Sequence, residues 1–383
     1  MKKALLVLKN NHSFIGNGVG PVGASFGECV FTTGMTGYVE SLTDPSYAGQ
    51  ILCFSYPLIG NYGMSSKWFE SAKMYANGMI AVNSSRQQFH ADSDLILDAF
   101  LENHGKTAIL GIDTRKLVKI LRNDGNQPSV LIVGDEDLIQ KYYNKYQLDE
   151  DFEFFVNLCE NKNEATLTDW PMIVTRKVPE TYIWQNDSLA NVEFDKTKKT
   201  IVILDCGVKM NIVREMSKRV GQVVVVPANY TASQILEFNP KGVLLSNGPG
   251  DPRDYDYIQQ TVIGLTNVDG LAIFGICLGH QMLSLAIGCE VFKMKFGNRG
   301  GNQPVQDLTT DKAYLTSQNH GYAVVPESIP TGYEIYFQNL NDETVEGIKH
   351  KSKPIFSVQF HPEACGGPQD TNFLFDKFVN SLN

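Results

Sequence analysis

The sequence predicts two domains of different fold class: a β-rich α+β domain at residues 1–150 and an α/β domain built on a parallel sheet at residues 201–383, joined by a connecting segment at 151–200. Three observations predict this architecture. The length of 383 residues suits two or three domains with cores of ordinary size. The first part of the chain contains short apolar runs bounded by turn residues, as β-rich domains do. In the last part such runs alternate with helical patterns, which is typical of βαβ units.

In the first domain, two segments predict amphipathic helices and the apolar runs predict strands. Ser93–Asn103 and Thr114–Arg122 carry apolar residues three and four positions apart, which is helical spacing. The lysines before Ala4–Leu8 make this run resemble a signal peptide, but its five apolar residues are fewer than the 7–15 of a signal sequence, so we expect a strand. The predicted strands are Ala4–Leu8, Cys29–Thr33, Gln50–Tyr56, Met79–Val82, Ala108–Gly111 and Ser129–Val133.

The polar stretch Gln185–Thr200 predicts the domain boundary. Beyond it, near-continuous apolar runs are expected for strands whose two faces are both covered by helices. The predicted strands are Ile201–Asp205, Gln222–Val226, Gly242–Leu245, Leu271–Phe274 and Pro354–Gln359. The predicted helices are Lys209–Val220, Thr231–Phe238, Leu278–Ile287 and Thr371–Leu382.

The composition narrows the class of function. Hydrophobic residues make up 43% and charged residues 20% of the chain, which is typical of globular proteins. The net charge of -9, without a basic block, argues against a nucleic-acid or membrane-surface partner and favours a small-molecule substrate. No apolar stretch approaches the ~20 residues of a membrane span. The seven scattered cysteines lack the spacing of a disulfide framework, so we expect thiols in a reducing, cytoplasmic compartment.

The segment Gly275–His280 has the form of a nucleophile elbow. It follows a predicted strand and precedes a helical pattern. Glycines on both sides of Cys277 allow a sharp turn that exposes its side chain, and the next residue, Leu278, offers a backbone N–H. The helix N-terminus favours the thiolate of Cys277. By itself the segment is also compatible with a glycine-bounded turn that contains a buried cysteine.

The segment His361-Pro362-Glu363 ends another predicted strand. Residues i and i+2 project to one side of a strand, so Glu363 can orient His361. An imidazole held by a carboxylate is the base that activates a cysteine nucleophile. An isolated His-Pro-Glu is also compatible with a structural turn. The carboxyl ends of parallel strands meet at one edge of a sheet, where ligand sites gather, and this favours the catalytic interpretation.

The loop Ser246–Pro252 follows a strand and is expected at the same edge. Its glycines allow backbone N–H groups to approach a substrate. Pro249 has no N–H, so a second oxyanion donor beside Leu278 must come from Gly248 or Gly250. An ordinary loop is the alternative.

A zinc site is the rival interpretation of these segments. Cys277 with His280, and His361 with Cys365, have the spacing of zinc ligands. The elbow glycines and Glu363 have no role in such a site, so we expect no metal. The sequence also has no phosphate-binding stretch of the form G-x-x-x-x-G-K-[ST], and we expect no cofactor in this chain.

Together, these motifs resemble those of a class I glutamine amidotransferase domain, and further motifs resemble the family of small, glutaminase subunits of carbamoyl phosphate synthetase. The resemblance covers nearly the whole chain and thins at about 134–200. The motifs that carry it in the second domain are Ser246–Pro252, Gly275–Gln281, Lys293–Gly297, Gly300–Asn302, Ser317–Tyr322 and His361–Glu363. Those in the first domain are Gly27-Glu28, Met35–Tyr38, Leu42–Tyr47, Tyr56-Pro57, Ile59–Asn61 and Gly111–Arg115. Two positions depart from the family pattern: Tyr322 stands where Phe is expected, and Asn298-Arg299 where a His pair is more usual.

The resemblance implies a Cys-His-Glu triad of Cys277, His361 and Glu363 that releases ammonia from L-glutamine through a thioester. The glutamine contacts that it implies are Ser46, Gly248, Gly250, Leu278, Gln281, Asn319, Gly321 and Tyr322. It also implies a large synthetase subunit that binds ATP with its metal ion, receives the ammonia and makes carbamoyl phosphate from bicarbonate for arginine and pyrimidine synthesis. A different class I amidotransferase, a stand-alone hydrolase and a non-catalytic subunit are the alternatives.

Overall fold

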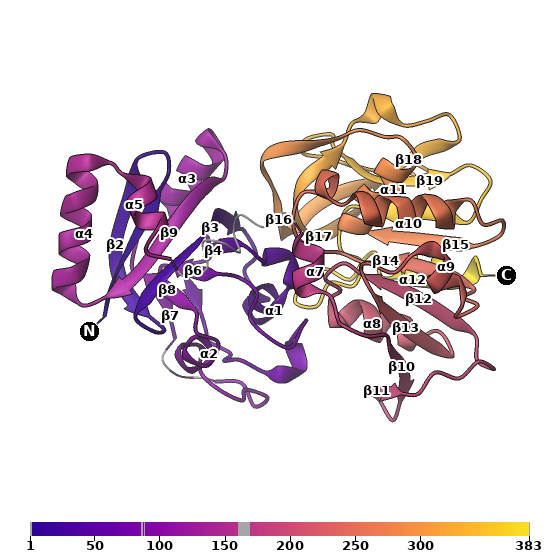
Figure 1. Cartoon of the computed structure of the whole chain (residues 1–383), viewed down its shortest axis with the longest axis horizontal. Coiled ribbons are helices and arrows are strands. Elements are labelled where there is room, and N and C mark those ends of the chain that lie inside the picture. Colours follow the sequence, from indigo (N-terminus) through magenta and orange to yellow (C-terminus); the bar gives the residue numbers. More distant parts are fainter. Residues whose placement is uncertain (1, 86, 88, 160–168, 383) are drawn as a thin grey trace. The chain divides into compact units, whose positions relative to one another are not determined.

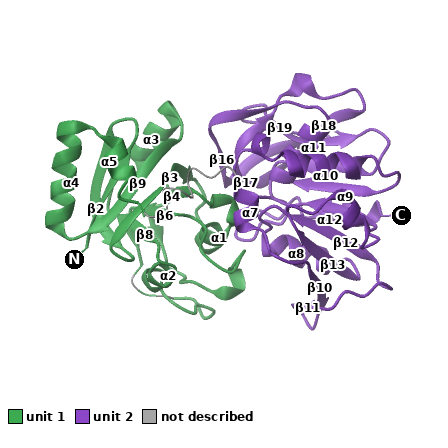
Figure 2. Cartoon of the chain, in the orientation of Figure 1, with its two compact units in different colours: residues 1–167 green, residues 168–383 purple. Residues whose placement is uncertain are grey.

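The structure is a computed structural model, and it describes residues 2–85, 87, 89–159 and 169–382. The chain forms two compact units, 1–167 (unit 1) and 168–383 (unit 2), shown in Figure 2. The segment expected to connect the domains is divided between them. Helix α5 (Phe152–Val156) belongs to unit 1, whereas the hairpin of β10 (Glu180–Gln185) and β11 (Ser188–Val192) belongs to unit 2.

Unit 1 is built on a closed barrel in which β1-β2-β8-β6-β4-β3-β9 are neighbours (Figure 1). The predicted first strand is confirmed as β1, which pairs antiparallel with β2 and β9 and is almost wholly buried. The other predicted strands of this domain are confirmed as well, while β2 was not predicted. The barrel strands are β1 (Lys3–Leu8), β2 (His12–Val19), β3 (Gly23–Thr32), β4 (Gln50–Phe54), β6 (Gly78–Ala81), β8 (Thr107–Leu110) and β9 (Gln127–Gly134).

The two predicted helices of unit 1 are α2 (Leu97–Asn103) and α3 (Thr114–Asp124). Helix α2 begins four residues later than predicted, because Leu95 forms a β-bridge with Met64. Helix α4 (Glu136–Asp149) was not predicted, since its charged sequence buries only Ile139 and Tyr146. The unit also contains α1 (Tyr38–Thr43), β5 (Leu58–Ile59) and β7 (Asn83–Ser84).

Unit 2 is built on one sheet with the strand order β11-β10-β13-β12-β14-β15-β20-β19-β17-β16-β18. Its centre, from β13 to β20, is parallel, as predicted. Alternate residues of β12, such as Ile203 and Leu204, enter separate buried clusters on the two faces, which explains the continuous apolar runs. The central strands are β12 (Thr200–Asp205), β13 (Gln222–Pro227), β14 (Gly242–Leu245), β15 (Ala272–Ile276) and β20 (Ile355–Val358).

Helices cover both faces of this centre. Helices α8 (Met210–Ser217) and α12 (Phe373–Asn380) pack on one face. Helices α9 (Ala232–Leu236), α10 (Asp256–Thr266) and α11 (Leu278–Ala286) pack on the other. Of these, only α10 was not predicted. None of the helices in the described ranges is long and apolar enough to cross a membrane.

Antiparallel strands extend the sheet on both sides, so it is mixed, whereas the sequence predicted only its parallel part. Strand β10 pairs antiparallel with β13, and β19 with β20. Strand β11 is an edge strand of the sheet and pairs with β10 alone, so its sequence lacks the apolar run of the central strands. The added elements are α7 (Trp170–Val174), β10, β11, β16 (Val291–Asp307), β17 (Lys312–Val324), β18 (Tyr333–Asn339) and β19 (Val345–His350).

Candidate active site

The candidate site lies at the carboxyl edge of the parallel strands in unit 2. The segments after β12, β14 and β15 contain Lys209, Gly248 and Cys277 respectively. Since these three strands are parallel neighbours, their carboxyl ends meet at one edge of the sheet (Figure 1). His361 lies shortly after β20, which is parallel to β15.

Cys277 occupies a sharp turn between β15 and α11. Its φ of 53° and ψ of -105° lie in a region that non-glycine residues rarely adopt, so the turn holds the backbone under strain. The turn requires glycine on both sides: a Cβ on Gly279 would lie 2.1 Å from the carbonyl oxygen of Leu245, and one on Gly275 would lie 2.6 Å from that of Gly279. The predicted strand–elbow–helix geometry is therefore present.

The Cys277 thiol is held between the helix and β17. Its Sγ donates to the carbonyl oxygen of Asn319 at 3.7 Å, and only 3% of the residue is exposed. Leu278 begins α11, so its N–H is one of the first donors of the helix, which have no acceptor within it. The helix N-terminus thus offers both a positive field for a thiolate and a backbone donor next to it.

His361 and Glu363 form a buried pair. Nδ1 of His361 lies 2.7 Å from Oε1 of Glu363, and both side chains are almost wholly inaccessible. The His361 backbone N–H donates to the carbonyl oxygen of Ser317 at 2.9 Å, which fixes the start of this segment against β17. Among the described residues, Nε2 of His361 is buried without a hydrogen-bond partner, which leaves it available to exchange a proton.

Lys209 forms a buried cluster with His361 and Glu363, and the sequence analysis did not predict this lysine. Its Nζ lies 3.1 Å from Oε1 of Glu363 and 3.1 Å from Nδ1 of His361, and its side chain is 11% exposed. Asn211 donates to the backbone carbonyl of Glu363 from the same region. The signal that could have identified Lys209 is its position directly after a parallel strand, at the edge where the other site residues were expected.

The charges in this cluster shift two pKa values in opposite directions. Burial opposes ionisation of Glu363, but Lys209 and His361 hold the pKa of its carboxyl at about 2. Burial and Lys209 lower the pKa of His361, but Glu363 and Cys277 outweigh them and raise it to about 9. At neutral pH the cluster therefore holds an ionised Glu363 and favours an imidazolium beside the Cys277 sulfur.

The loop 246–252 approaches the elbow closely because of its glycines. A Cβ on Gly248 would lie 2.1 Å from the carbonyl oxygen of Cys206 and 2.7 Å from Cδ2 of Leu278. Gly250 has a φ of 93°, and a Cβ there would lie 1.6 Å from the Tyr255 hydroxyl. Gly248 therefore packs against the side chain of Leu278, and the role of the two backbone N–H groups as oxyanion donors stays a prediction.

Several of the other predicted contact residues lie around Cys277. Gln281 donates from Nε2 to the carbonyl oxygen of Tyr322 at 3.2 Å and to Oε1 of Gln359 at 3.0 Å. Asn319 contacts Cys277 through its backbone oxygen, and Gly321 lies between Asn319 and Tyr322 on β17. The role of each in binding glutamine stays a prediction.

Ser46 belongs to unit 1. It is buried in a short 3₁₀ turn, Pro45–Tyr47, and its backbone N–H donates to Oδ1 of Asp44 at 2.8 Å. Its contact with glutamine also stays a prediction.

The residues of the zinc interpretation have other partners. Nδ1 of His280 lies 2.8 Å from Oγ of Ser357, and burial lowers the pKa of this imidazole to about 3. No three His, Cys, Asp or Glu side chains within the described ranges lie together as metal ligands would. The seven cysteines, all in described parts of the chain, form no disulfide bond.

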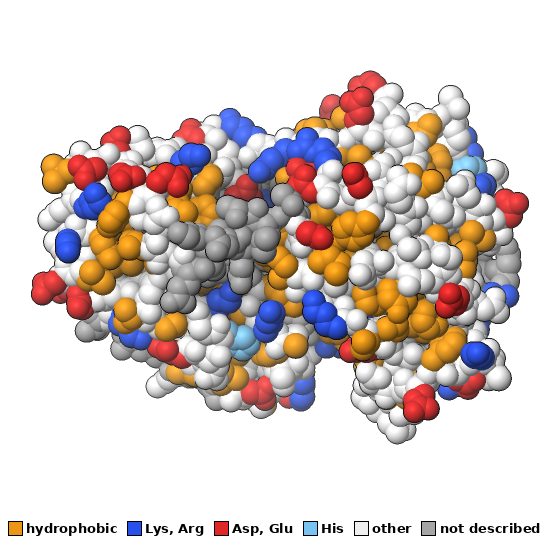
Figure 3. Space-filling model, in the orientation of Figure 1, with side chains coloured by type: hydrophobic (Ala, Val, Ile, Leu, Met, Phe, Trp, Pro, Cys, Tyr) orange, Lys and Arg blue, Asp and Glu red, His pale blue; other side chains and the backbone are white. Residues whose placement is uncertain are grey.

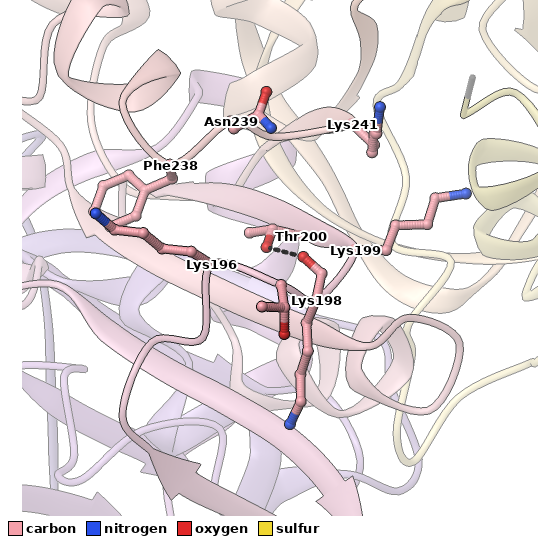
Figure 4. Close-up of a pocket in the computed structure, with 8 residues that line it drawn as sticks. Lys196, Lys198, Lys199, Thr200, Phe238, Asn239 and Lys241 are labelled. Atoms are coloured by element: carbon pink, nitrogen blue, oxygen red, sulfur yellow. Dashed lines mark hydrogen bonds between the residues drawn. The ribbon is translucent and has the colours of Figure 1, made fainter.

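A basic pocket of about 340 Å³ lies elsewhere in unit 2. It includes Thr200 and Lys241, which are at the amino ends of β12 and β14, and is therefore at the opposite edge of the sheet from Cys277. Figure 4 shows that its labelled lysine side chains diverge, so they present no convergent set of donors. On the face drawn in Figure 3, acidic and basic side chains are interspersed over both units.

A cysteine in a strand–elbow–helix turn, next to a buried His-Glu pair at the carboxyl edge of a parallel sheet, defines this chain's second unit as a class I glutamine amidotransferase domain. The family model "Glutamine amidotransferase class-I" matches residues 202–381. The model "Carbamoyl-phosphate synthase small chain, CPSase domain" matches residues 6–131.

Similar proteins match the chain over its whole length. The carbamoyl phosphate synthase small chain of Methanocaldococcus jannaschii is 44% identical over 378 residues, 98% of each chain. That of Listeria monocytogenes is 41% identical over 100% of this chain and 98% of its own, and that of Oceanobacillus iheyensis is 41% identical over 100% and 96%. The chain belongs to the family of carbamoyl phosphate synthase small chains. The predicted family, fold class and class of enzyme are confirmed.

Proposed function

We propose that this chain is the glutamine-hydrolysing subunit of a carbamoyl phosphate synthase, with Cys277 as nucleophile, His361 as base and Glu363 as the residue that orients the base. The observation that carries the proposal is the position of Cys277 in the strained elbow, beside a His361–Glu363 pair with a separation of 2.7 Å. The pKa of His361, raised to about 9, supports an imidazolium that can donate a proton at neutral pH.

The proposed reaction begins when the Cys277 thiolate forms a bond to the carboxamide carbon of glutamine. The carbonyl electron pair moves to oxygen, and the N–H groups of Leu278 and Gly248 stabilise the resulting oxyanion. The intermediate then collapses: the C–N bond breaks, and His361 donates its proton to the nitrogen so that ammonia leaves. A water molecule next adds to the thioester carbon and gives a proton to His361, and cleavage of the C–S bond releases glutamate and restores the thiolate.

The proposed glutamine site combines the backbone of the glycine loop with β17. Gly248, Gly250 and Leu278 would offer backbone donors to the substrate. In unit 2, the family resemblance implies further contacts from four residues, Gln281, Asn319, Gly321 and Tyr322. No cofactor is needed for these steps, because all proton transfers run through His361.

The proposed partner is the large chain of the same synthase, in the cytoplasm. It would bind ATP with its metal ion, take up the ammonia and make carbamoyl phosphate from bicarbonate for arginine and pyrimidine synthesis. The relatives' names, which specify a small chain, support this division of work.

The test compares glutamine with ammonia as nitrogen donor. Cys277→Ser replaces the thiolate by a hydroxyl that is almost never ionised near neutrality, so the complex with the large chain should lose carbamoyl phosphate synthesis from glutamine but keep it from ammonia. Cys289→Ser, at a buried cysteine outside the elbow, is the matched control and should keep both. Substantial synthesis from glutamine by Cys277→Ser would contradict the nucleophile assignment, and loss of the ammonia-dependent reaction would point to a structural role.

A further inference from the structure

The short segment between β12 and α8 contacts two parts of the candidate active site. At its end, Lys209 places its ammonium 3.1 Å from Oε1 of Glu363 and 3.1 Å from Nδ1 of His361. At its start, the carbonyl oxygen of Cys206 lies so close to Gly248 that a Cβ there would be 2.1 Å away. The conformation of this segment therefore affects both the buried charges and the glycine loop.

Hydrogen bonds also connect this segment, residues 206–209, to the glycine loop after β14. The backbone N–H of Cys206 donates to Oγ of Ser246 at 2.9 Å. The backbone N–H of Lys209 donates to Oδ1 of Asn247 at 3.1 Å. Both acceptor side chains belong to completely buried residues. A displacement of the segment would therefore disturb the glycine loop as well.

Asp205, the last residue of β12, holds the start of the segment in a tight turn. Its Oδ1 accepts hydrogen bonds from the backbone N–H groups of Gly207 at 3.0 Å and of Val208 at 2.8 Å. Gly207 has a φ of 125°, and a Cβ there would lie 3.0 Å from Cδ of Pro249. The carboxylate thus stabilises a turn that is packed directly against the glycine loop.

The other oxygen of Asp205 is bound by Arg176, which lies between α7 and β10. Oδ2 accepts from the backbone N–H of Arg176 at 3.0 Å and from its Nε at 2.9 Å, and the two side chains are 4% and 11% exposed. Arg176 also pairs with Glu180 of β10 at 2.7 Å. Its neighbour Thr175 accepts a hydrogen bond from the N–H of Ala228, directly after β13, at 3.0 Å. Asp205 is therefore held by a stretch that is anchored to β10 and to the end of β13.

We propose that Asp205, held by Arg176, is a positioning residue for the candidate active site. Its two oxygens accept hydrogen bonds from two sides at once, as a carboxylate can. Through the turn that it stabilises, it sets the Lys209 ammonium against the His361–Glu363 pair. Its effect on rate rests on the proposed glutaminase function, whereas its effect on the place of the ammonium does not.

Asp205→Asn tests the proposal at nearly constant size. The amide has a single acceptor oxygen, so its amino group must face the donors of one side, and the turn loses hydrogen bonds. In the complex with the large chain, kcat for glutamine hydrolysis should fall by about 10- to 100-fold, since a misplacement of about 1 Å can cost 10²-fold. Carbamoyl phosphate synthesis from ammonia should not change.

Glu215→Gln is the matched control. Glu215 lies on α8, its side chain is 11% exposed, and it pairs with Arg219 at 2.6 Å. The variant therefore also removes a buried carboxylate from an arginine, but at a pair outside the segment 206–209, and it should keep the natural kcat. A kcat as low as that of Asp205→Asn would mean that any such loss impairs the site, which would overturn the specific role of Asp205.

The titration of His361 reads the place of the Lys209 ammonium without any catalysis. Burial and Lys209 lower the pKa of His361, whereas Glu363 and Cys277 raise it, to about 9. When the ammonium is held less firmly, this pKa should rise. It can be followed by NMR in the full chain with isotope-labelled histidine, and the signal is identified by its loss in His361→Asn. We expect Asp205→Asn to raise this pKa.

Two further variants decide whether the effect passes through Lys209. Lys209→Met should also raise the pKa of His361, and adding Asp205→Asn to it should cause no further rise. Arg176→Met leaves the bonds of Asp205 to the turn and removes one of its supports, so it should act in the same direction by less. This variant carries the test if Asp205→Asn does not fold. The nearby His320 stays neutral over this range, because burial lowers its pKa to about 4.

The outcomes separate this proposal from the proposed function. An unchanged pKa of His361 in every folded variant of Asp205 and Arg176 would overturn the positioning role. A rise caused by Asp205→Asn that is equally large in the Lys209→Met background would overturn it as well. A raised pKa without loss of glutamine hydrolysis would uphold the positioning of the ammonium and contradict the proposed catalytic role of His361.

Discussion

The two edges of the parallel sheet in unit 2 both carry charged side chains, but in opposite arrangements. At the amino edge, Lys199 and Lys241 are exposed and their ammonium groups diverge (Figure 4). At the carboxyl edge, Lys209, His361 and Glu363 are almost wholly buried, and their charged atoms lie within 3.1 Å of one another. Exposed charges interact weakly in water, whereas buried ones shift each other's pKa strongly. The comparison teaches that burial and convergence of the charged side chains, rather than their number, distinguish the edge with the candidate active site from the solvated edge.

The largest effect is expected from His361→Asn at the carboxyl edge. The imidazole must both accept and donate the reacting proton, so its loss should lower kcat for glutamine hydrolysis by about 10²–10⁴-fold. Glu363→Gln should cost less, because the carboxylate orients the ring and stabilises its charged form without touching the substrate. Steady-state rates of both variants test whether His361→Asn loses more kcat than Glu363→Gln, and circular dichroism checks that both are folded. A folded Glu363→Gln variant slower than His361→Asn would reverse the two roles.

A smaller effect is expected from Lys209→Met, which removes one charge from the buried cluster. The folded-state pKa of Glu363, held near 2, should rise, since Lys209 is the strongest of the groups that lower it. The ionised Glu363 contributes stability above the pKa of an unfolded glutamate and loses it as the pH falls toward 2. The free energy of unfolding that the variant loses relative to the natural chain should therefore be largest at pH 7 and shrink below about pH 4. The loss in the free energy of unfolding should stay under the ~3–5 kcal/mol that breaking a buried ion pair costs, because His361 still pairs with Glu363 in the variant.

Urea unfolding of Lys209→Met at pH 7 and pH 3 measures this deficit. Lys349→Met, which breaks the more exposed pair with Glu334 at 3.1 Å, is the control and should cost at most about 1 kcal/mol. Equal deficits for the two variants at pH 7 would mean that burial does not strengthen the Lys209 pair.

The smallest effect is expected at the amino edge. Lys199→Gln combined with Lys241→Gln removes two exposed ammonium groups that point away from each other (Figure 4). The free energy of unfolding should change by no more than about 0.5 kcal/mol per site, and glutamine hydrolysis should not change. Unfolding curves and glutaminase rates of the double variant test this. A marked loss of activity would show that glutamine hydrolysis depends on the lysines of the amino edge, and the difference proposed between the two edges would be wrong.

Much of the fold could be predicted from local sequence. The parallel strands of unit 2 are short apolar runs with turn residues at both ends, because each is buried on two faces and needs no polar alternation. The β10–β11 hairpin and α4 lie at the surface and bury little, so their sequences carry no comparable signal. The polar stretch Gln185–Thr200, which was expected to mark the domain boundary, contains strand β11 of unit 2.

The sequence by itself determined the sharp turn at Cys277, since the glycines on both sides of it permit that turn, and it placed His361 and Glu363 two residues apart. The strand geometry expected for this pair was wrong, because β20 ends at Val358 and the pair lies in the turn that follows. Only the tertiary structure decided which other groups act on them. Lys209, which follows β12, reaches Glu363, which follows β20, although the two residues are far apart in the chain. The physical reason is that a buried charge interacts with whatever the packed sheet brings within a few ångströms, and no local pattern records those neighbours.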